Sequence, residues 1–191
     1  MSDRFAYLYQ PLERFDFARV IEHWSVHGVT VQNPATQQIT YLSEEGDQII
    51  TSLSGLQAAV VGDNPHTFQL WFMVDGDISC RFRRTAGRRL VEEYSLVGLT
   101  KAERSRISNI LVDRFEAYAM NTANLFLVID FEGYTIELPW ERLSVAGEYT
   151  DVICPDILGF RHNRFVDFKK CGYLRDRAAE CGDYLIVRKT D

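Results

Sequence analysis

Acidic side chains are concentrated between residues 130 and 156, a segment with seven acidic residues and only one Lys or Arg, Arg142. A surface of this charge can attract a positively charged protein or imitate a nucleic-acid backbone. The alternative is a solvated acidic rim that only aids solubility. The first interpretation predicts a partner-binding surface of carboxylates with aromatic anchors, since Trp and Tyr dominate interface hot spots. Its members would be Glu132, Tyr134, Glu137, Trp140, Glu141, Glu148, Tyr149 and Asp151. Trp140 could instead belong to the core.

Five arginines form a second charged group, and no acid lies between Ser79 and Leu90: they are Arg81, Arg83, Arg84, Arg88 and Arg89. On a hairpin they could bind phosphates. However, strand alternation turns Phe82 to the inner side, so no aromatic residue for base stacking shares their face. The pattern favours a solvated hairpin edge, where cations discourage edge-to-edge aggregation. Nucleic-acid binding is the less favoured alternative.

Histidines and cysteines could hold a metal, but their spacing argues against it. His23 and His27 lie four residues apart on an expected helix, yet the glutamate of an HExxH motif is missing. A zinc site from Cys154, His162, Cys171 and Cys181 would lack two ligands within a few residues of each other. We therefore expect no metal or other cofactor. We expect the four cysteines, which include Cys80, to be reduced thiols.

No catalytic motif is present, and no nucleophile can be named. Asp130 and Glu132 could act as an acid–base pair, but they flank an expected turn, where such residues are usually exposed. The GxSxG, GxxxxGK[ST] and GxGxxG patterns are missing. The leading expectation is a protein that is not an enzyme. The alternative is an enzyme or small-ligand-binding protein with a pocket under the loop 145–167.

The element that organises the chain is a helix expected from Thr100 to Asn121. Thr100 and Glu103 have the spacing of a capping box. An apolar stripe follows at helical spacing and needs a sheet to cover: Ile107, Ile110, Leu111, Phe115 and Tyr118. Residues off the stripe should meet water, among them Lys101, Arg104, Ser108, Asp113 and Glu116.

The remaining pattern predicts an α+β fold, in which two main helices pack on one face of an antiparallel sheet. The first helix runs from Asp16, as N-cap, to His27, before Gly28. Strands are expected at 5–9, 29–32, 39–42, 48–53, 68–74, 77–84, 88–97, 125–130, 134–138 and 184–188. A short helix is possible at 56–61 and another at 175–180. The chain is expected to be one domain, 1–191, with a division into lobes 1–63 and 64–191 left open.

The bulk composition excludes little but sets a direction. The net charge is −6, which argues weakly against general nucleic-acid affinity and fits a basic protein partner. The first residues lack the basic start and apolar run of a signal peptide, and no apolar segment is long enough to span a membrane. We therefore expect a cytoplasmic protein.

The run VEEYSLVGLTKAERSRISNIL, followed by NLFLVIDFEGYTIELPWERL, resembles small bacterial proteins of the polymorphic-toxin immunity type. In that pattern a V-E-E-Y…G-L-T strand-to-helix start precedes an L-V-V-D-x-x-G strand and an acidic stretch with a Trp. The matching positions are Val91 to Thr100, Leu127 to Gly133 and Trp140, within residues 91–143. The resemblance implies a cytoplasmic, non-catalytic protein that binds and occludes one cognate toxin. It carries no catalytic residue to this chain.

Overall fold

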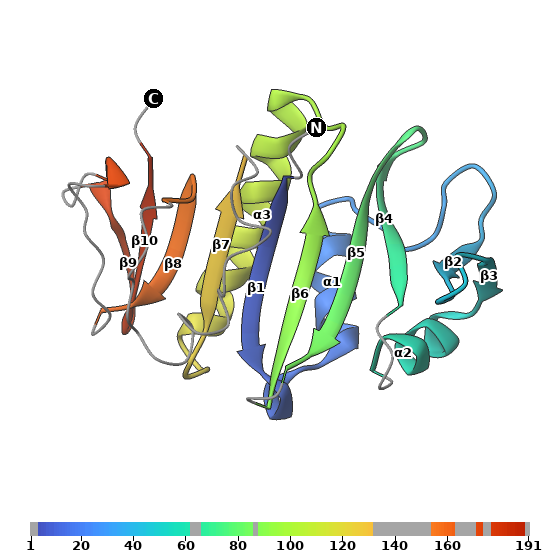
Figure 1. The fold of residues 1–191 in the computed structure, drawn as a ribbon, viewed down its shortest axis with the longest axis horizontal. Helices are drawn as coiled ribbons and strands as arrows, with labels where there is room; N and C mark the ends of the chain where they lie inside the picture. Colours follow the sequence, from blue (N-terminus) through green and yellow to red (C-terminus); the bar gives the residue numbers. More distant parts are fainter. Residues whose placement is uncertain are drawn as a thin grey trace.

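The computed structural model describes residues 4–61, 66–85, 88–131, 154–162, 171–173 and 177–189. In this part of the chain, ten strands form one antiparallel sheet in the order β3-β2-β4-β5-β6-β1-β7-β8-β10-β9 (Figure 1). The strands are β1 Phe5–Pro11, β2 Ile39–Leu42, β3 Gln48–Thr51, β4 Thr67–Met73, β5 Gly76–Arg84, β6 Arg89–Ser95, β7 Phe126–Asp130, β8 Ile157–Arg161, β9 Ala179–Cys181 and β10 Tyr184–Arg188. The helices are α1 Phe17–Val26, α2 Leu53–Val61 and α3 Lys101–Ala119, with a 3₁₀ turn at Leu12–Arg14. The expected α+β class is confirmed.

Both main helices begin at the residues that their capping patterns predict. The Asp16 carboxylate accepts hydrogen bonds from the backbone amides of Ala18 and Arg19 at the start of α1. At the start of α3, Thr100 and Glu103 form the reciprocal capping box. Gly28 follows α1 with a φ of +73°, a conformation that glycine adopts without a steric penalty.

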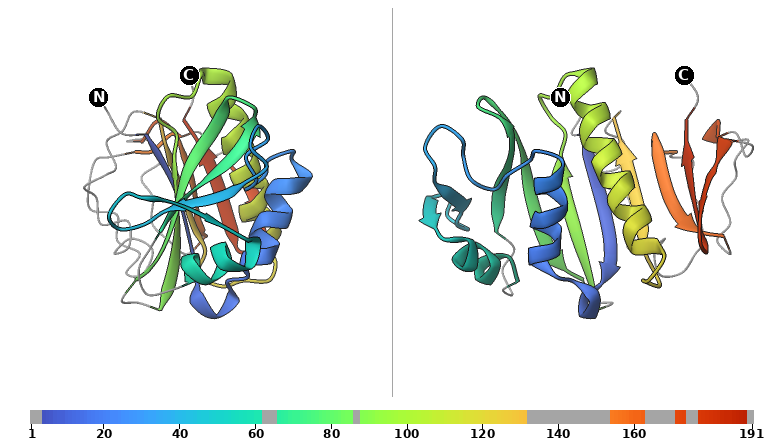
Figure 2. Two further views of the ribbon diagram at one scale, coloured as in Figure 1. Left: turned by 90° about the vertical axis from the view of Figure 1, so that its right-hand side faces the viewer. Right: turned by 180° about the vertical axis from the view of Figure 1, so that it is seen from behind.

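The helices α1 and α3 cover the same face of the sheet (Figure 2). Two hydrogen bonds tie them to each other: His23 Nε2 donates to the Ile110 carbonyl at 3.0 Å, and Arg106 Nη2 donates to the His27 carbonyl at 2.9 Å. The larger core lies between these helices and the sheet and includes Leu8, Trp24, Phe68, Phe82, Leu111, Phe115 and Leu127. Along β5, Ile78, Cys80 and Phe82 point into it, as their alternation predicts.

A second buried cluster lies on the opposite face of the sheet. Because side chains alternate along a strand, β1 sends Ala6 and Leu8 to the helical side and Tyr7 and Tyr9 to this one. The cluster also contains Val91, Phe126, Val128, Leu158, Phe160, Cys171, Tyr173, Leu185 and Val187. The central strands are thus buried on both faces, which explains their nearly continuous apolar runs.

A charged pair lies inside the larger core. Arg114 of α3 donates two hydrogen bonds to the carboxylate of Glu92 on β6, and a third to the Tyr94 hydroxyl at 3.0 Å. Tyr94 and the Gln10 amide also donate to Glu92. Burial alone would lower the pKa of Arg114, but the Glu92 carboxylate raises it above its usual value. These partners offset the cost of removing the two charges from water.

Several expected elements are wrong or shifted. Residues 29–32 form only isolated bridges, Thr30 with Trp71 and Gln32 with Ile39, instead of a strand. Ile157–Arg161, expected inside a long loop, forms strand β8 between β7 and β10. Ala179–Cys181 is a strand and not part of a helix. The expected strand at 134–138 lies outside the described residues.

Ser108 is also placed differently from the expectation that it meets water. It is 1% exposed, because it lies on the side of α3 that faces the sheet, next to the apolar stripe.

Strands of the two possible lobes, 1–63 and 64–191, pair directly with each other: β2 with β4, and β1 with β6 and β7. In the described ranges, none of the helices combines the length and the apolar character that crossing a membrane requires.

Candidate functional site

The eight residues predicted to bind a partner, Glu132 to Asp151, lie outside the described residues, so that surface stays a prediction. Two other acids of the same segment are described, and neither is a freely exposed carboxylate. Asp130, expected near an exposed turn, is 1% exposed at the end of β7. Asp156 accepts a hydrogen bond from the Phe131 amide at 2.6 Å. Neither of these two acids therefore adds to an open acidic surface.

The arginine group does not form a hairpin edge. β5, which carries Arg81, Arg83 and Arg84, pairs with β4 on one side and β6 on the other. Arg83 forms an ion pair with Glu93 at 3.7 Å, and Arg89 is 7% exposed. The interpretation as a solvated edge is therefore wrong. The group is divided between exposed, paired and buried side chains, so it makes no continuous phosphate-binding strip.

The expectation of four reduced thiols is wrong for two of them. Cys154 and Cys171 form a disulfide, with Cα atoms 5.0 Å apart, although 17 positions separate them in sequence. The Tyr173 hydroxyl donates to the Pro155 carbonyl at 2.6 Å and helps to hold the two segments together. Sequence spacing carries no information about this proximity. The expected cytoplasmic location, which was drawn from the missing signal peptide and membrane span, stays a prediction.

His23 and His27 lie close together, but the contact that His23 makes joins two helices. The rings of His23 and His27 lie 5.0 Å apart, but His23 already donates to the Ile110 carbonyl between α1 and α3. Burial lowers the pKa of His23, because the charged ring would lose water. No group of three or more His, Cys, Asp or Glu side chains in the described ranges could hold a metal ion.

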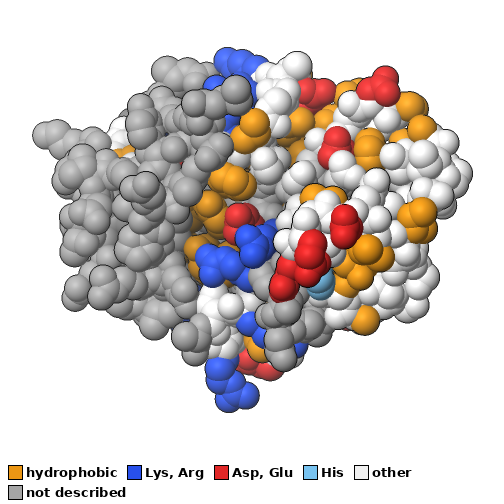
Figure 3. Space-filling view, turned by 45° about the vertical axis from the view of Figure 1, so that its right-hand side comes forward, with side chains coloured by type: hydrophobic (Ala, Val, Ile, Leu, Met, Phe, Trp, Pro, Cys, Tyr) orange, Lys and Arg blue, Asp and Glu red, His pale blue; other side chains and the backbone are white. Residues whose placement is uncertain are grey.

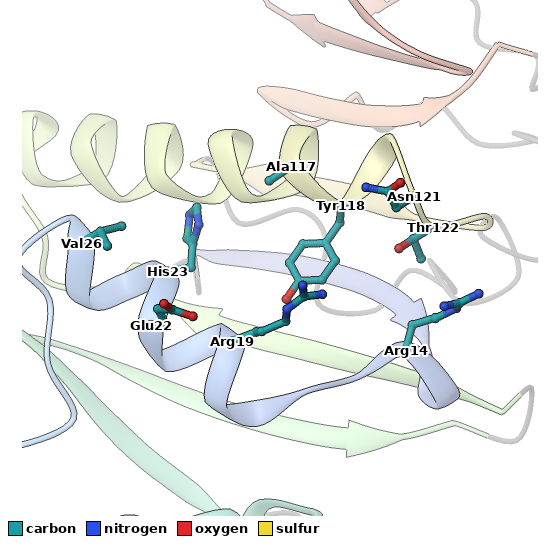
Figure 4. Close-up of a pocket in the computed structure, with 9 residues that line it drawn as sticks. All are labelled: Arg14, Arg19, Glu22, His23, Val26, Ala117, Tyr118, Asn121 and Thr122. Atoms are coloured by element: carbon teal, nitrogen blue, oxygen red, sulfur yellow. The ribbon is translucent and has the colours of Figure 1, made fainter.

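A groove of about 420 Å³ lies between α1 and the C-terminal end of α3. Figure 4 shows Arg19 and Tyr118 projecting toward one another across it, with Arg14 further along near Thr122. The arginines that line the groove are exposed, and none of its lining residues is a described side chain with an orphaned buried polar atom. The groove therefore lacks the convergent, desolvated polar groups that mark a specific ligand site.

The clearest binding feature is the open edge of the sheet at β3. In the described part of the chain, β3 has a neighbouring strand only on its β2 side. Apolar side chains on and beside this edge are exposed: Ile50 by 63%, Leu53 by 45%, Leu42 by 43% and Ile49 by 37%. We call these four residues, together with the free backbone of β3, the β3 edge. An open edge presents unpaired backbone groups that can pair with another chain, and exposed apolar side chains favour such pairing.

The backbone of β3 has hydrogen-bonding groups available for such pairing. In the β2–β3 hairpin the Ser43 amide donates to the Asp47 carbonyl at 2.9 Å, and the register continues through Tyr41–Ile49 and Ile39–Thr51. Hydrogen-bonded and non-bonded pairs alternate in an antiparallel ladder. The backbone groups of Gln48 and Ile50 therefore face the open edge and can receive an added strand.

The charge around the β3 edge is negative. The hairpin turn carries three exposed acids, Glu44, Glu45 and Asp47. Bonds from its own backbone amide and the Ser43 hydroxyl lower the pKa of Glu45, so this carboxyl is ionised at neutral pH. No Lys or Arg occurs between residues 20 and 80, so the sequence itself carries a signal for this negative region. In Figure 3 the right-hand part of the molecule shows acidic and hydrophobic side chains and a histidine, but no Lys or Arg.

Comparisons of this chain with models of protein families, with curated proteins and with solved structures found no match.

Proposed function

We propose that this protein is a non-catalytic binding protein that holds a basic protein at the β3 edge, and that the partner is a bacterial toxin. The observation that carries the proposal is the open strand with four exposed apolar side chains beside three acids. Strand addition supplies affinity through the backbone and specificity through side chains on alternate faces.

The charge pattern supports a basic partner over a second copy of this chain. Two copies would each bring the acidic turn of residues 44–47, with no Lys or Arg between residues 20 and 80 to balance it. A partner rich in Lys and Arg gains attraction during approach and places its own apolar strand against Ile49 and Ile50. The predicted acidic surface from Glu132 to Asp151 would extend the same preference.

The toxin identity is supported by the resemblance of residues 91–143 to immunity-type proteins. Binding at the β3 edge would occlude the toxin, because a toxin strand paired with β3 would be covered, together with the toxin surface around it. In this proposal inhibition is steric and electrostatic, and no residue of this chain performs chemistry on the toxin.

The test uses the product of the open reading frame next to the gene for this chain. Bacteria expressing that product should stop growing, and coexpression of this chain should restore growth. Calorimetry with the purified pair should give a saturable affinity that weakens with added salt. A neighbouring product that is not toxic, or that this chain neither binds nor neutralises, would overturn the proposal.

Two matched variants test the β3 edge. Ile50→Lys puts a cation on the edge and should weaken binding at least tenfold, while Val97→Lys makes the same change at another exposed position (41%) and should leave binding within twofold. Circular dichroism checks that both remain folded. Equal binding by the two variants would remove the β3 edge from the proposal. A dimer of this chain alone that Ile50→Lys converts to a monomer would identify the edge as a self-association surface instead.

A further inference from the structure

A separate pocket of about 270 Å³ lies between the N-terminal half of α3 and the ends of three strands in the interior of the sheet. These are the C-terminal ends of β7 and β10 and the start of β8, which lie side by side (Figure 1). The residues lining the pocket include four cationic side chains, Lys101, Arg104, Arg188 and Lys189, and one acid, Asp156. We propose that this pocket binds the phosphoryl group of a small molecule. The proposal does not depend on the partner bound at the β3 edge.

One side of α3 supplies the polar groups. Lys101, Arg104, Ser105 and Ser108 recur at spacings of three and four residues, so they line up along the helix over its first two turns. The positive end of the helix dipole lies at the same place and favours an anion. Thr100 and Glu103 already cap the first turn, so the ligand would lie against the side of the helix and not on its terminal amides.

Arg104 is held in position before any ligand arrives. Its Nη1 donates to the Leu99 carbonyl at 2.6 Å, and its guanidinium carbon lies 5.8 Å from the centre of the Phe131 ring. A guanidinium fixed in this way loses little conformational entropy when it binds a phosphate. Lys101 and Arg188 are exposed and form no ion pair with another described residue, so their charges remain available.

Besides the cationic side chains, Ser108 is an independent indication of a ligand. It lines the pocket, is 1% exposed, and its hydroxyl has no hydrogen-bond partner. A buried hydroxyl without a partner costs about 1–3 kcal/mol, and native proteins rarely keep one without a reason. A phosphoryl oxygen would accept a hydrogen bond from it. The combination of a rigid guanidinium, two further cations and a hydroxyl donor suits a phosphate better than a carboxylate.

Ser108→Ala separates a binding role from a structural one. Removing an unsatisfied buried hydroxyl should leave the melting temperature of the free protein unchanged or higher. The same variant should weaken binding of inorganic phosphate, measured by calorimetry, about tenfold, because one donor to a charged acceptor is lost. Ser25→Ala, at an exposed position of α1, is the matched control and should change neither quantity.

Lys101→Met and Arg188→Met should each also weaken phosphate binding about tenfold, whereas Arg81→Met, which removes an exposed cation from β5, should not. Acetate at the same ionic strength should bind at least tenfold more weakly than phosphate. The proposal is overturned if phosphate binding does not saturate, if Arg81→Met weakens it as much as the pocket variants, or if acetate binds equally well. An undiminished affinity in Ser108→Ala would also overturn it.

Discussion

The guanidinium of Arg114 on α3 and the carboxylate of Glu92 on β6 form a two-pronged ion pair in which both side chains are fully buried. The pair joins the helix to the centre of the sheet, and Tyr94 and Gln10 complete the hydrogen bonds of the carboxylate. Burial raises the pKa of Tyr94, which keeps its hydroxyl protonated as a donor.

Breaking this pair from one side should be costly. Arg114→Met or Glu92→Met leaves a buried charge without its partner, and each should lower the free energy of unfolding by about 3–5 kcal/mol. The double variant removes both charges and should lose clearly less than the sum of the two. Urea unfolding of the four proteins measures this coupling. Additive losses would contradict a direct interaction between the two charges.

The position of His23 predicts a dependence of stability on pH. Because burial lowers its pKa in the folded state, the fold favours the neutral ring. The contribution is therefore complete above the unfolded pKa of about 6.5 and is lost as the pH falls toward the lower folded value. The hydrogen bond to the Ile110 carbonyl and the Asp113 carboxylate raise this pKa, and the neighbouring Arg114 and His27 lower it, but burial is the largest influence.

His23→Gln should therefore lose less stability than the native protein when urea unfolding is compared at pH 7 and pH 5. Glutamine can still donate to the Ile110 carbonyl, so the contact between helices is retained. His162→Gln, at an exposed position, is the control and should behave as the native protein does. The same pH dependence in all three proteins would show that His23 is not its source.

The disulfide predicts the number of reactive thiols. Under denaturing conditions without reductant, two thiols per chain should titrate, those of Cys80 and Cys181. Replacing Cys154 and Cys171 with alanine should lower the free energy of unfolding by about 3 kcal/mol, the amount expected for a loop of this size. Dithiothreitol should destabilise the native protein and leave that variant unchanged. A titration of four thiols would contradict the pairing.

Gly159 is required for packing on β8. A Cβ at this position would lie 2.9 Å from Phe115 Cζ and 3.1 Å from Leu127 Cβ. Gly159→Ala should therefore lower the free energy of unfolding by about 1–3 kcal/mol. Adding Phe115→Leu, which shortens the opposing side chain, should cost less in the Gly159→Ala protein than in the native one. Thermal and urea unfolding of the single and double variants measure this difference.

Local chemistry could be predicted from the sequence, and long-range pairing could not. The caps at Asp16 and Thr100 and the alternation along β5 are set by near neighbours, and all three are confirmed. β8 was missed because it follows Pro155 and contains Gly159, both of which usually mark a break. Its strand forms because β7 and β10 offer it partners on both sides.

The site was harder to predict for the same reason. That β3 is an edge depends on the order of all ten strands, which no local pattern contains. Arg114 carried a signal that was overlooked, since it lies three residues after Leu111 on the apolar side of the helix. A charged residue in an apolar stripe predicts a buried partner, here Glu92. Ser108 borders the same stripe and is buried with it.

The place of β1 in the middle of the sheet has a consequence for synthesis on the ribosome. β1 is made before both of its neighbours, β6 and β7, which end only at Ser95 and Asp130. At a translation rate of about 5–20 residues per second, the backbone hydrogen-bonding groups and apolar side chains of β1 remain without these partners for several seconds. Synthesis must therefore reach Asp130 before β1 can form hydrogen bonds on both sides, and the nascent protein is exposed to aggregation until then.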